Sequence, residues 1–383
     1  MSTRPPAELS ELRHRTAEPA PRRRRRWPRL LVVLAGVLVL VLVLVGLYVS
    51  ALARSYDDNR RTVDAPTVQG SDGGPVNILL LGSDSRAGEE EKSADAEGER
   101  SDTMMLVHVP ADRRHVYVMS VLRDLYVDIP GHGKDKVNSA LAKGGYPLAI
   151  DTVEELLGVP VNHIVEVDFQ GFRGVTAALG GVAVCNPNAF SSGVRAPSYF
   201  PRGQILLQDT AALRYVRERH AFANGDVTRV ENQQRVVSGA LDRFLSFDVL
   251  ADPAQTMDVV STLSRHLTVD QGLDSRTVAG YAWDLRSLAS EDVEMFTVPN
   301  AGGATDAVGQ QVVLPDEEKI ARLKDALARD DVGSYLDREE AEKRARAAER
   351  RRQEATVSPS PSATSPAAPS SPAPAAAVED PCG

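Results

Sequence analysis

Cysteine is scarce in this chain of 383 residues. The two cysteines are Cys185, which lies in an apolar run, and Cys382, which lies close to the end. Two cysteines exclude a framework of several disulfides and a cysteine-type metal site. A Cys185–Cys382 disulfide is one alternative, but its second anchor would lie in a flexible tail. We therefore expect a buried free thiol at Cys185.

Positive charge is also scarce beyond the first residues of the chain. The formal net charge is −9 at pH 7, and residues 1–29 hold nine arginines and three glutamates, a net of +6, which leaves −15 for residues 30–383. This balance argues against a general nucleic-acid-binding surface, so we expect no nucleic-acid partner. Any basic site must be a local concentration of arginine on an acidic background.

The motifs of several common enzyme classes are absent. The sequence has no Gly-x-Ser-x-Gly nucleophile elbow, and Gly302-Gly303 lacks the strand–loop–helix context and the lysine of a phosphate-binding loop. The seven histidines show no metal-ligand spacing. The chemistry must therefore depend on other side chains.

One long apolar run lies near the N-terminus. Residues 30–50 are 21 residues without a charge, almost all Leu and Val, and at about 1.5 Å per residue they span about 31 Å, the thickness of a bilayer's hydrocarbon core. The arginines before the run, at 22–26 and 29, place the N-terminus in the cytoplasm by the positive-inside rule. Ala51-Leu52-Ala53 is similar to a signal-peptide cleavage site, but the run exceeds the roughly 7–15 apolar residues of such a peptide, so we favour an uncleaved anchor. Both interpretations place the rest of the chain outside the cytoplasm.

Composition divides the chain into five segments, which together predict a single-pass protein of the cell membrane. The end of the chain is rich in charge and then in Pro, Ala and Ser, and such a tail cannot bury enough apolar surface to fold. The expected segments are a cytoplasmic basic segment (1–29), a transmembrane helix (30–50), a stalk (51–75), an extracytoplasmic folded domain (76–336) and a charged, then Pro/Ala/Ser-rich, disordered tail (337–383).

Short apolar runs bounded by turn residues predict strands within the domain. Val76–Leu81 is nearly all apolar, as expected for a strand buried on both faces. Thr103–Val109 and His115–Val121 form a hairpin around the turn at 110–114. Strands mixed with helices predict an α/β fold, an α/β/α sandwich on a mixed central β-sheet. The other predicted strands are Val161–Phe169 and Val182–Cys185, and the predicted helices are Pro147–Leu157, Arg229–Phe247, Pro253–His266, Asp274–Leu288 and Pro315–Leu327.

Aspartates and arginines gather at one end of the predicted strands. Asp84 and Arg86 follow the carboxyl end of the first strand, where ligands tend to bind in open α/β sheets. The hairpin pairs position 102 with about position 122. Asp102 should therefore lie beside Arg123 and Asp124.

Two later segments add arginines and a helix terminus. If the preceding helix ends early enough, Arg217 and Arg219 lie in extended chain and share one face. Asp226 and Arg229 open a long helix, with Gln233 one turn later, and a helix N-terminus beside an arginine is suited to an anion.

These residue types suit a phosphate site. Arginine binds two phosphate oxygens at once through its planar donors. A pair of aspartates can hold Mg²⁺, which prefers carboxylates together with substrate phosphates, and a single aspartate can take the proton from an attacking hydroxyl. For any one Arg–Asp pair the alternative is an ordinary surface salt bridge. The convergence of five segments favours a functional site.

Six segments in a fixed order carry a family resemblance: Asn77–Arg86, Arg100–Met104, Ser120–Asp124, Lys136–Ala140, Arg217–Arg219 and Gly225-Asp226. They resemble the motifs of the LytR–CpsA–Psr family, over about residues 76–247, and the membrane anchor matches as well. The resemblance implies a bacterial phosphotransferase outside the cytoplasm. Such an enzyme takes a glycopolymer from a polyprenyl diphosphate and joins it to a peptidoglycan hydroxyl through a phosphodiester.

The resemblance also implies roles for individual residues. Asp84 and Asp102 would hold Mg²⁺ on the diphosphate. The expected substrate-binding residues are Arg86, Arg100, Arg123, Arg217, Arg219, Arg229 and Gln233. The expected catalytic residues are Arg123, Asp124, Arg217, Arg219 and Asp226.

Two features set this chain apart from the family pattern. Many members have an arginine where this chain has Asn232, and Arg235 is a candidate to compensate. The acidic stretch Glu89–Glu99 separates two motif segments and is interpreted as a variable loop near the mouth of the site.

Two other functions remain alternatives. One is a lipid diphosphate hydrolase, in which water replaces the sugar hydroxyl, and the other is a non-catalytic, membrane-anchored regulator of the cell envelope. The expected partners are the polyprenyl diphosphate-linked glycopolymer, peptidoglycan and membrane lipid. The sequence leaves open which glycopolymer is transferred and which residues form the apolar groove for the prenyl chain.

Overall fold

The computed structural model describes residues 27–68, 70, 73–83, 101–193, 197–222 and 225–357. The chain forms two compact units, residues 1–49 and residues 50–383. Helix α1 (Trp27–Asn59) contains the expected apolar run, and its stretch Val37–Asn59 is long and apolar enough to cross a membrane, with a mean hydropathy of 2.5. The expected N-terminal apolar helix is confirmed as a candidate membrane span.

The segment expected to be a stalk is partly structured. Helix α1 continues to Asn59, and strand β1 (Arg61–Val63) then pairs with strand β12 (Leu267–Asp270). The Tyr56 hydroxyl donates a hydrogen bond of 2.8 Å to the Leu273 carbonyl. Residues 51–63 of the expected stalk are therefore structured, and polar residues there bind the backbone that follows β12.

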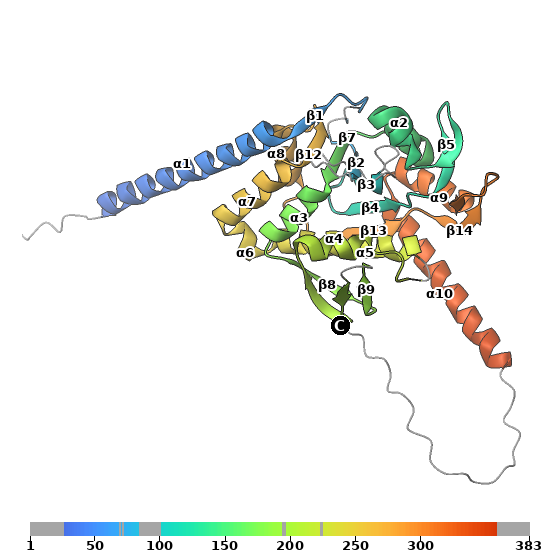
Figure 1. The fold of residues 1–383 in the computed structure, drawn as a ribbon. Helices are drawn as coiled ribbons and strands as arrows, with labels where there is room; N and C mark the ends of the chain where they lie inside the picture. Colours follow the sequence, from blue (N-terminus) through green and yellow to red (C-terminus); the bar gives the residue numbers. More distant parts are fainter. Residues whose placement is uncertain are drawn as a thin grey trace, which may run out of the picture. The chain divides into compact units, whose positions relative to one another are not determined.

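The domain contains a mixed sheet of seven strands, in the order β1-β12-β7-β2-β3-β4-β13 (Figure 1). Strand β2 lies at its centre, antiparallel to β3 and parallel to β7, while β13 lies parallel to β4 at the edge. The mixed sheet with flanking helices confirms the predicted fold class. The remaining strands of this sheet are β2 (Val76–Ser83), β3 (Ser101–Val109), β4 (Val116–Val121), β7 (His163–Asp168) and β13 (Val293–Thr297).

Alternation along β2 supplies both faces of the sheet with apolar side chains. Leu79 and Leu81 pack on the side of helices α2 (Ser139–Leu157) and α9 (Glu317–Ala328). Leu80 packs on the opposite side, with side chains from α5 (Gly225–Leu245) and α8 (Ser275–Asp284). The sheet therefore lies between two helical layers.

A separate apolar cluster joins the elements beyond the sheet. It contains Phe190, Phe200 and Tyr215 among its buried residues. The predicted strand Val182–Cys185 forms, but it pairs with β11 and not with the central sheet. The elements here are α3 (Phe169–Ala178), β8 (Val182–Asn186), β9 (Phe190–Ser192), β10 (Ser198–Phe200), β11 (Gly203–Leu207), α4 (Asp209–Arg217), α6 (Phe247–Leu250) and α7 (Pro253–Ser264).

Two hairpins and a long helix complete the described chain. The hairpins are β5–β6 and β14–β15, and backbone pairing of Leu125 with Val313 links the second to the chain after β4. Their strands are β5 (Tyr126–Ile129), β6 (Gly133–Lys136), β14 (Asn300–Thr305) and β15 (Gln311–Pro315), and a short 3-10 helix, η1, covers Ser290–Asp292.

The charged segment before the tail is helical. Helix α10 (Val332–Val357) begins with the buried Tyr335, and Glu339 pairs with both Lys319 and Arg322 of α9. Farther along, the helix is exposed and carries i,i+4 pairs such as Arg344–Glu340. Residues 358–383 of the expected disordered tail lie outside the described residues, as do residues 1–26.

Cys185 takes part in a disulfide, and the expectation of a buried free thiol is wrong. The side chain lies on β8, a strand of a two-stranded sheet, where it is only half-buried. Cys382 is the one other cysteine in the sequence, and it lies outside the described residues.

The orientation of the anchor remains a prediction. A reporter that is active only outside the cytoplasm, fused after Gly383, should be active, because arginine before the apolar run retains the N-terminus inside. Replacing the arginines at 22–26 by glutamate removes this positive charge and is the matched test of its effect on orientation. Activity of a cytoplasm-only reporter at the same position in the unaltered chain would contradict the orientation.

Candidate active site

A cavity of about 740 Å³ lies between one face of the sheet and helices α3, α4 and α5. It opens beside the carboxyl ends of β2 and β4, at the end of the sheet where the sequence predicted the site. Its described lining residues are Leu80, Leu81, Gly82, Thr103, Met105, Arg123, Val167, Asp168, Phe169, Phe172, Leu213, Val216, Arg217, Glu218, Arg219, His220, Arg229, Gln233 and Val237.

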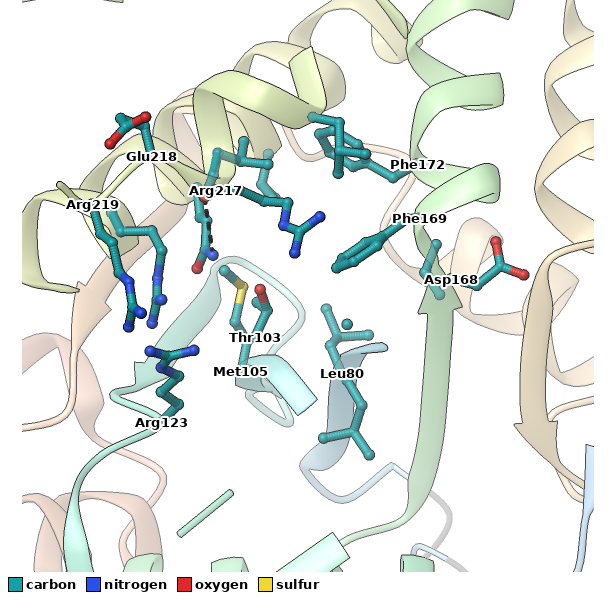
Figure 2. Close-up of a pocket in the computed structure, with 18 of the residues that line it drawn as sticks. Leu80, Thr103, Met105, Arg123, Asp168, Phe169, Phe172, Arg217, Glu218 and Arg219 are labelled. Carbon is teal, nitrogen blue, oxygen red and sulfur yellow. Dashed lines mark hydrogen bonds between the residues drawn. The ribbon is translucent and has the colours of Figure 1, made fainter. Parts of the chain in front are cut away.

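The lining has an apolar part and a cationic part. Leu80, Met105 and Phe172 belong to the apolar part, which sequence reasoning expected but could not assign to residues. Figure 2 shows Arg123 and Arg219 pointing toward one another, whereas the Arg217 side chain extends toward Phe169. The chemistry of this lining suits a molecule with an apolar chain and an anionic head.

A tight turn after β4 presents Arg123. The strand is buried along its whole length, and the turn is anchored on both sides by Leu122 and Leu125, which are 1% and 0% exposed. The Leu125 amide donates to the Leu122 carbonyl at 2.9 Å, and the Asn138 amide donates to the Arg123 carbonyl at 3.2 Å. Arg123 and Asp124, between the two leucines, are therefore directed away from the core.

The end of α4 presents the other two arginines. The helix ends at Arg217, and Glu218 is already extended. The Glu218 carboxylate accepts the amide hydrogens of His220 at 2.7 Å and Ala221 at 3.0 Å, which stabilises the turn that follows. The Arg217 guanidinium lies 4.5 Å from the centre of the Phe169 ring, a cation–π contact that orients it. Arg217 and Arg219 therefore diverge and do not share one face, since Arg217 still belongs to the helix.

Two carboxyl groups contact the basic side chains of the cationic part. Asp226 Oδ2 lies 3.4 Å from Arg123 Nε and 3.2 Å from Arg229 Nη2. Asp124 lies 3.6 Å from Arg123 and 3.1 Å from Lys136 Nζ. Helix α5 begins at Gly225, as the sequence predicted, and places Asp226 in its first turn.

The pKa values of the two carboxyl groups, Asp226 and Asp124, are shifted in opposite directions. Burial, together with the hydrogen bond to Asp124, raises the pKa of Asp226 against the attraction of Arg229 and Arg123. Burial would also raise the pKa of Asp124, but the hydrogen bond from Asp226 and the charges of Arg123 and Lys136 lower it. At a pH between the two shifted pKa values, Asp226 is protonated and donates a hydrogen bond to the ionised Asp124.

Most of the predicted site residues within the described ranges converge. Arg123, Arg217, Arg219, Arg229 and Gln233 line the cavity, and Asp124 and Asp226 contact Arg123. Gln233 also donates to the Val216 carbonyl of α4 at 3.4 Å. Asp84, Arg86, Arg100 and the loop Glu89–Glu99 lie outside the described residues.

The backbone of Asp102 lies at the site. Met104 pairs with Val121, one residue from the expected register, and Asp102 precedes Met104 on β3 at the end of the hairpin where Arg123 follows β4. Within the described part of the chain, no group of three or more His, Cys, Asp or Glu side chains is placed to hold a metal ion. Mg²⁺ commonly binds through only one or two carboxylates plus substrate phosphates and water, so the expected Mg²⁺ site remains a prediction.

Sequence reasoning missed two charged residues that organise the site. Lys136 pairs with Asp124, and Glu218 holds the turn between Arg217 and Arg219. Both residues lie inside the motif segments, Lys136 in Lys136–Ala140 and Glu218 in Arg217–Arg219. Their place in these motifs was the sequence feature that could have identified them. Arg235 does not take the place of the missing family arginine, because it binds Asn232 Oδ1 at 2.9 Å and lines a separate hollow on another side of α5.

The fold and the site define a class of protein, an α/β domain with an apolar cavity whose arginine-lined mouth suits an anionic group. The sequence model of the LytR_cpsA_psr family matches residues 43–329, and the chain belongs to the LytR–CpsA–Psr family.

Individual relatives extend this finding. The chain is 33% identical to the polyisoprenyl-teichoic acid–peptidoglycan teichoic acid transferase TagU of Enterococcus faecalis, over 76% of this chain and 93% of the relative. The crystal structure of B. subtilis TagT is similar with a TM-score of 0.53 and 26% identity, over 70% of this chain and 99% of that one. A structure of TagT bound to LIIa-WTA is similar with a TM-score of 0.52 and 28% identity, over 69% and 93%.

Proposed function

We propose that the protein is a phosphotransferase that moves a glycopolymer from a polyprenyl diphosphate carrier onto a peptidoglycan hydroxyl, forming a phosphodiester link in the cell wall. The observation that carries the proposal is the single cavity in which an apolar lining meets four arginines, Arg123, Arg217, Arg219 and Arg229. An apolar lipid chain is stabilised by contact with the apolar lining, and a diphosphate is bound by the arginines.

The comparisons support the same reaction. The relative from Enterococcus faecalis is named for transfer of teichoic acid from a polyisoprenyl carrier to peptidoglycan. The anchor helix supports a catalytic domain beside the outer face of the cell membrane, where such a lipid carrier lies. Membrane lipid is therefore a further proposed partner.

The residues act on the donor by binding and by charge. The arginines bind the diphosphate oxygens and stabilise the negative charge that develops as the bond between the phosphates breaks. The acceptor hydroxyl oxygen forms a bond to the sugar-side phosphorus. The bond from that phosphorus to the bridging oxygen breaks, and the lipid leaves as its monophosphate with that oxygen.

The carboxyl pair is the group that takes the acceptor proton. Asp226 has the raised pKa, so its ionised form is the stronger base of the two, and it lies beside Arg123 and Arg229 at the mouth. Asp124, paired with Lys136, stays ionised and accepts the hydrogen bond from Asp226 when that group is protonated.

The role of this pair gives a pH prediction. Transfer should rise with pH through the raised pKa of Asp226, because the protonated carboxyl accepts no proton below it. Asp226→Asn should move the acid limb of the rate–pH profile to lower pH, since the remaining carboxyl, Asp124, has a lowered pKa. The rate at neutral pH should fall on the order of tenfold because a weaker base remains. An unchanged acid limb in the variant would contradict this assignment.

Magnesium is the proposed cofactor, held by Asp84 and Asp102. When bound, it would neutralise charge on the diphosphate. Asp102→Ala should raise the half-saturating Mg²⁺ concentration about tenfold or more, equal to roughly 1.4 kcal/mol or more of binding free energy. Excess Mg²⁺ should restore part of the rate. Rates measured against Mg²⁺ concentration check this, with Asp112→Ala, in the turn at the far end of β3, as the matched control.

Product analysis tests the function itself. The full chain in detergent, supplied with a polyprenyl diphosphate-linked glycopolymer and peptidoglycan, should yield polymer linked through a phosphodiester. Release of free polymer phosphate in place of that link would indicate the hydrolase. Tight binding without either product would indicate the non-catalytic regulator.

A further inference from the structure

The end of the anchor helix is bound to the start of α8. The Ser275 amide donates to Asp57 Oδ1 at 3.0 Å, and the Tyr56 hydroxyl donates to the Leu273 carbonyl just before α8. Asp57 lies seven positions after Ser50, where the apolar run ends, which is about 10 Å along a helix. The first turn of α8 is therefore tied to chain that lies close to the end of the apolar run.

The outward face of α8 carries a large exposed aromatic ring between two arginines. Trp283 is 67% exposed, and the Arg286 guanidinium lies 4.5 Å from the centre of its ring. Tyr281 and Leu285 each lie two positions from Trp283, on the opposite side of the helix, and pack in the apolar cluster beneath. We call the outward face the α8 ridge, and its exposed residues are Arg276, Ala279, Gly280, Trp283 and Arg286.

The α8 ridge is cationic on a domain that is acidic. Residues 30–383 have a negative net charge, whereas the ridge holds two arginines and no acidic side chain. The acidic residues next to the ridge are engaged elsewhere. Asp274 accepts the Thr277 amide hydrogen at 2.8 Å and caps the helix, and Asp284 lies 3.8 Å from Arg113 Nε. The charge that the ridge offers to a partner is therefore positive.

The α8 ridge lies on the same side of the sheet as the catalytic cavity. Leu80, Met105 and Val237 line the cavity and belong to the same apolar cluster as Tyr281 and Leu285 on the inward face of α8. A flat surface against the ridge would therefore lie on the helical layer that holds the cavity, and not on the layer of α2 and α9.

The chemistry and the position of the ridge suit a lipid bilayer. Tryptophan is enriched at membrane–water interfaces, where its ring sits at the level of the head groups. Arginine places its apolar stem along such a surface and its guanidinium among the phosphates. Because the anchor helix already brings a bilayer to the start of α8, its position favours a lipid surface over a protein partner.

We propose that the α8 ridge lies on the surface of the membrane that holds α1, with the Trp283 ring at the level of the head groups and Arg276 and Arg286 bound to anionic lipid phosphates. The proposal rests on α1 as the membrane anchor and requires no substrate. This contact orients the domain so that the layer with the catalytic cavity faces the bilayer.

Tryptophan fluorescence tests the contact directly. The chain has two tryptophans, Trp27 and Trp283, so Trp27→Phe leaves Trp283 as the sole tryptophan emitter. The full chain is placed in vesicles of equal parts of phosphatidylglycerol and phosphatidylcholine. Lipids brominated near the head group should reduce the Trp283 emission about twofold or more, because a ring at that level contacts the first part of the acyl chains. Equal emission with brominated and unbrominated lipids would overturn the proposal and leave the ridge to a protein partner or to water.

Charge reversal tests the arginines of the ridge. Arg276→Glu with Arg286→Glu should abolish the quenching, because phosphatidylglycerol repels the two carboxylates. Arg351→Glu with Arg352→Glu, exposed on α10, is the matched control and should leave the quenching unchanged. Arg286 stacks on Trp283, so each variant is compared by its ratio of emission in brominated and unbrominated vesicles, which cancels changes in the emission itself. Quenching that survives reversal of both ridge arginines would overturn their binding to lipid phosphates.

A displaced tryptophan tests which side of the domain contacts the lipid. In a chain with Trp27→Phe and Trp283→Phe, the exposed Ser334→Trp on α10 should show no quenching, since the neighbouring Tyr335 packs with the other helical layer. Equal quenching there would indicate non-specific contact and overturn the proposal.

Polymer transfer is measured separately from quenching. Quenching of Trp283 in a chain that transfers nothing would support the ridge and overturn the proposed reaction. Transfer without quenching would overturn the ridge and leave the proposed reaction in place.

Discussion

Replacing Arg123 with alanine should lower polymer transfer by about 10²–10³-fold, the usual effect of removing one preorganised donor from developing negative charge. Its guanidinium lies within 3.4 Å of Asp226 and faces Arg219 across the mouth of the cavity (Figure 2). Removing it takes away a cation from the diphosphate and also releases the two carboxyl groups that it bridges. Arg219→Ala and Arg217→Ala should act in the same direction.

Lysine should restore little activity at Arg123. A point charge cannot contact two oxygens and two carboxylates in the fixed plane of a guanidinium. Arg114→Ala is the matched control, because Arg114 is exposed in the turn at the other end of β3 and β4. Arg113 is unsuitable, since its guanidinium donates to the Pro110 and Gly74 carbonyls and holds that turn. Loss of transfer in Arg114→Ala, with full activity in a folded Arg123→Ala chain, would show that we have assigned the site to the wrong end of the sheet.

Shortening the lipid of the donor should weaken its binding steeply. Each isoprene unit has five carbons, and at about 0.8 kcal/mol per buried CH₂ a seated unit contributes up to about 4 kcal/mol, or nearly 10³-fold in affinity. The affinity should stop rising once the chain fills the cavity of about 740 Å³. Donor analogues of graded chain length, with the same diphosphate and sugar, measure this directly.

Phe172 offers a matched variant for the chain-length series. Its ring lines the apolar part of the cavity (Figure 2). Phe172→Ala should reduce the gain per isoprene unit and leave the affinity for the shortest analogue unchanged, because that analogue is held by the arginines. An affinity independent of chain length in the unaltered protein would contradict a lipid site in this cavity.

Local patterns in the sequence identified most of the fold. The hairpin of β3 and β4 follows from two apolar runs around a polar turn, and its register was one residue from the expected one. That register is short-range, because the turn sets it, so Asp102 and Arg123 could be placed at one end of the sheet. Helical spacing predicted a helix over Arg229–Phe247, and α5 begins four residues earlier, at Gly225.

Other features depend on contacts between residues far apart in the sequence, and the periodicity of apolar residues does not predict such contacts. Strand β1 is three residues long and forms because β12, about 200 positions later, offers it an edge. Cys185 was expected in a core and lies on a two-stranded sheet, half-buried and disulfide-bonded. A short strand and a lone cysteine have too little local pattern to predict either outcome.

The sequence by itself determined several strands and helices, the apolar N-terminal helix and the identity of the arginines and aspartates, because each depends on residues close together in the chain. Only the tertiary structure determined the directions and the surroundings of those side chains. The end of α4 separates Arg217 from Arg219 and directs the first to Phe169. Packing of α3, α4 and α5 over the sheet leaves the apolar cavity. Burial, together with the hydrogen bond to Asp124, raises the pKa of Asp226, since desolvation and pairwise charge depend on distances in space.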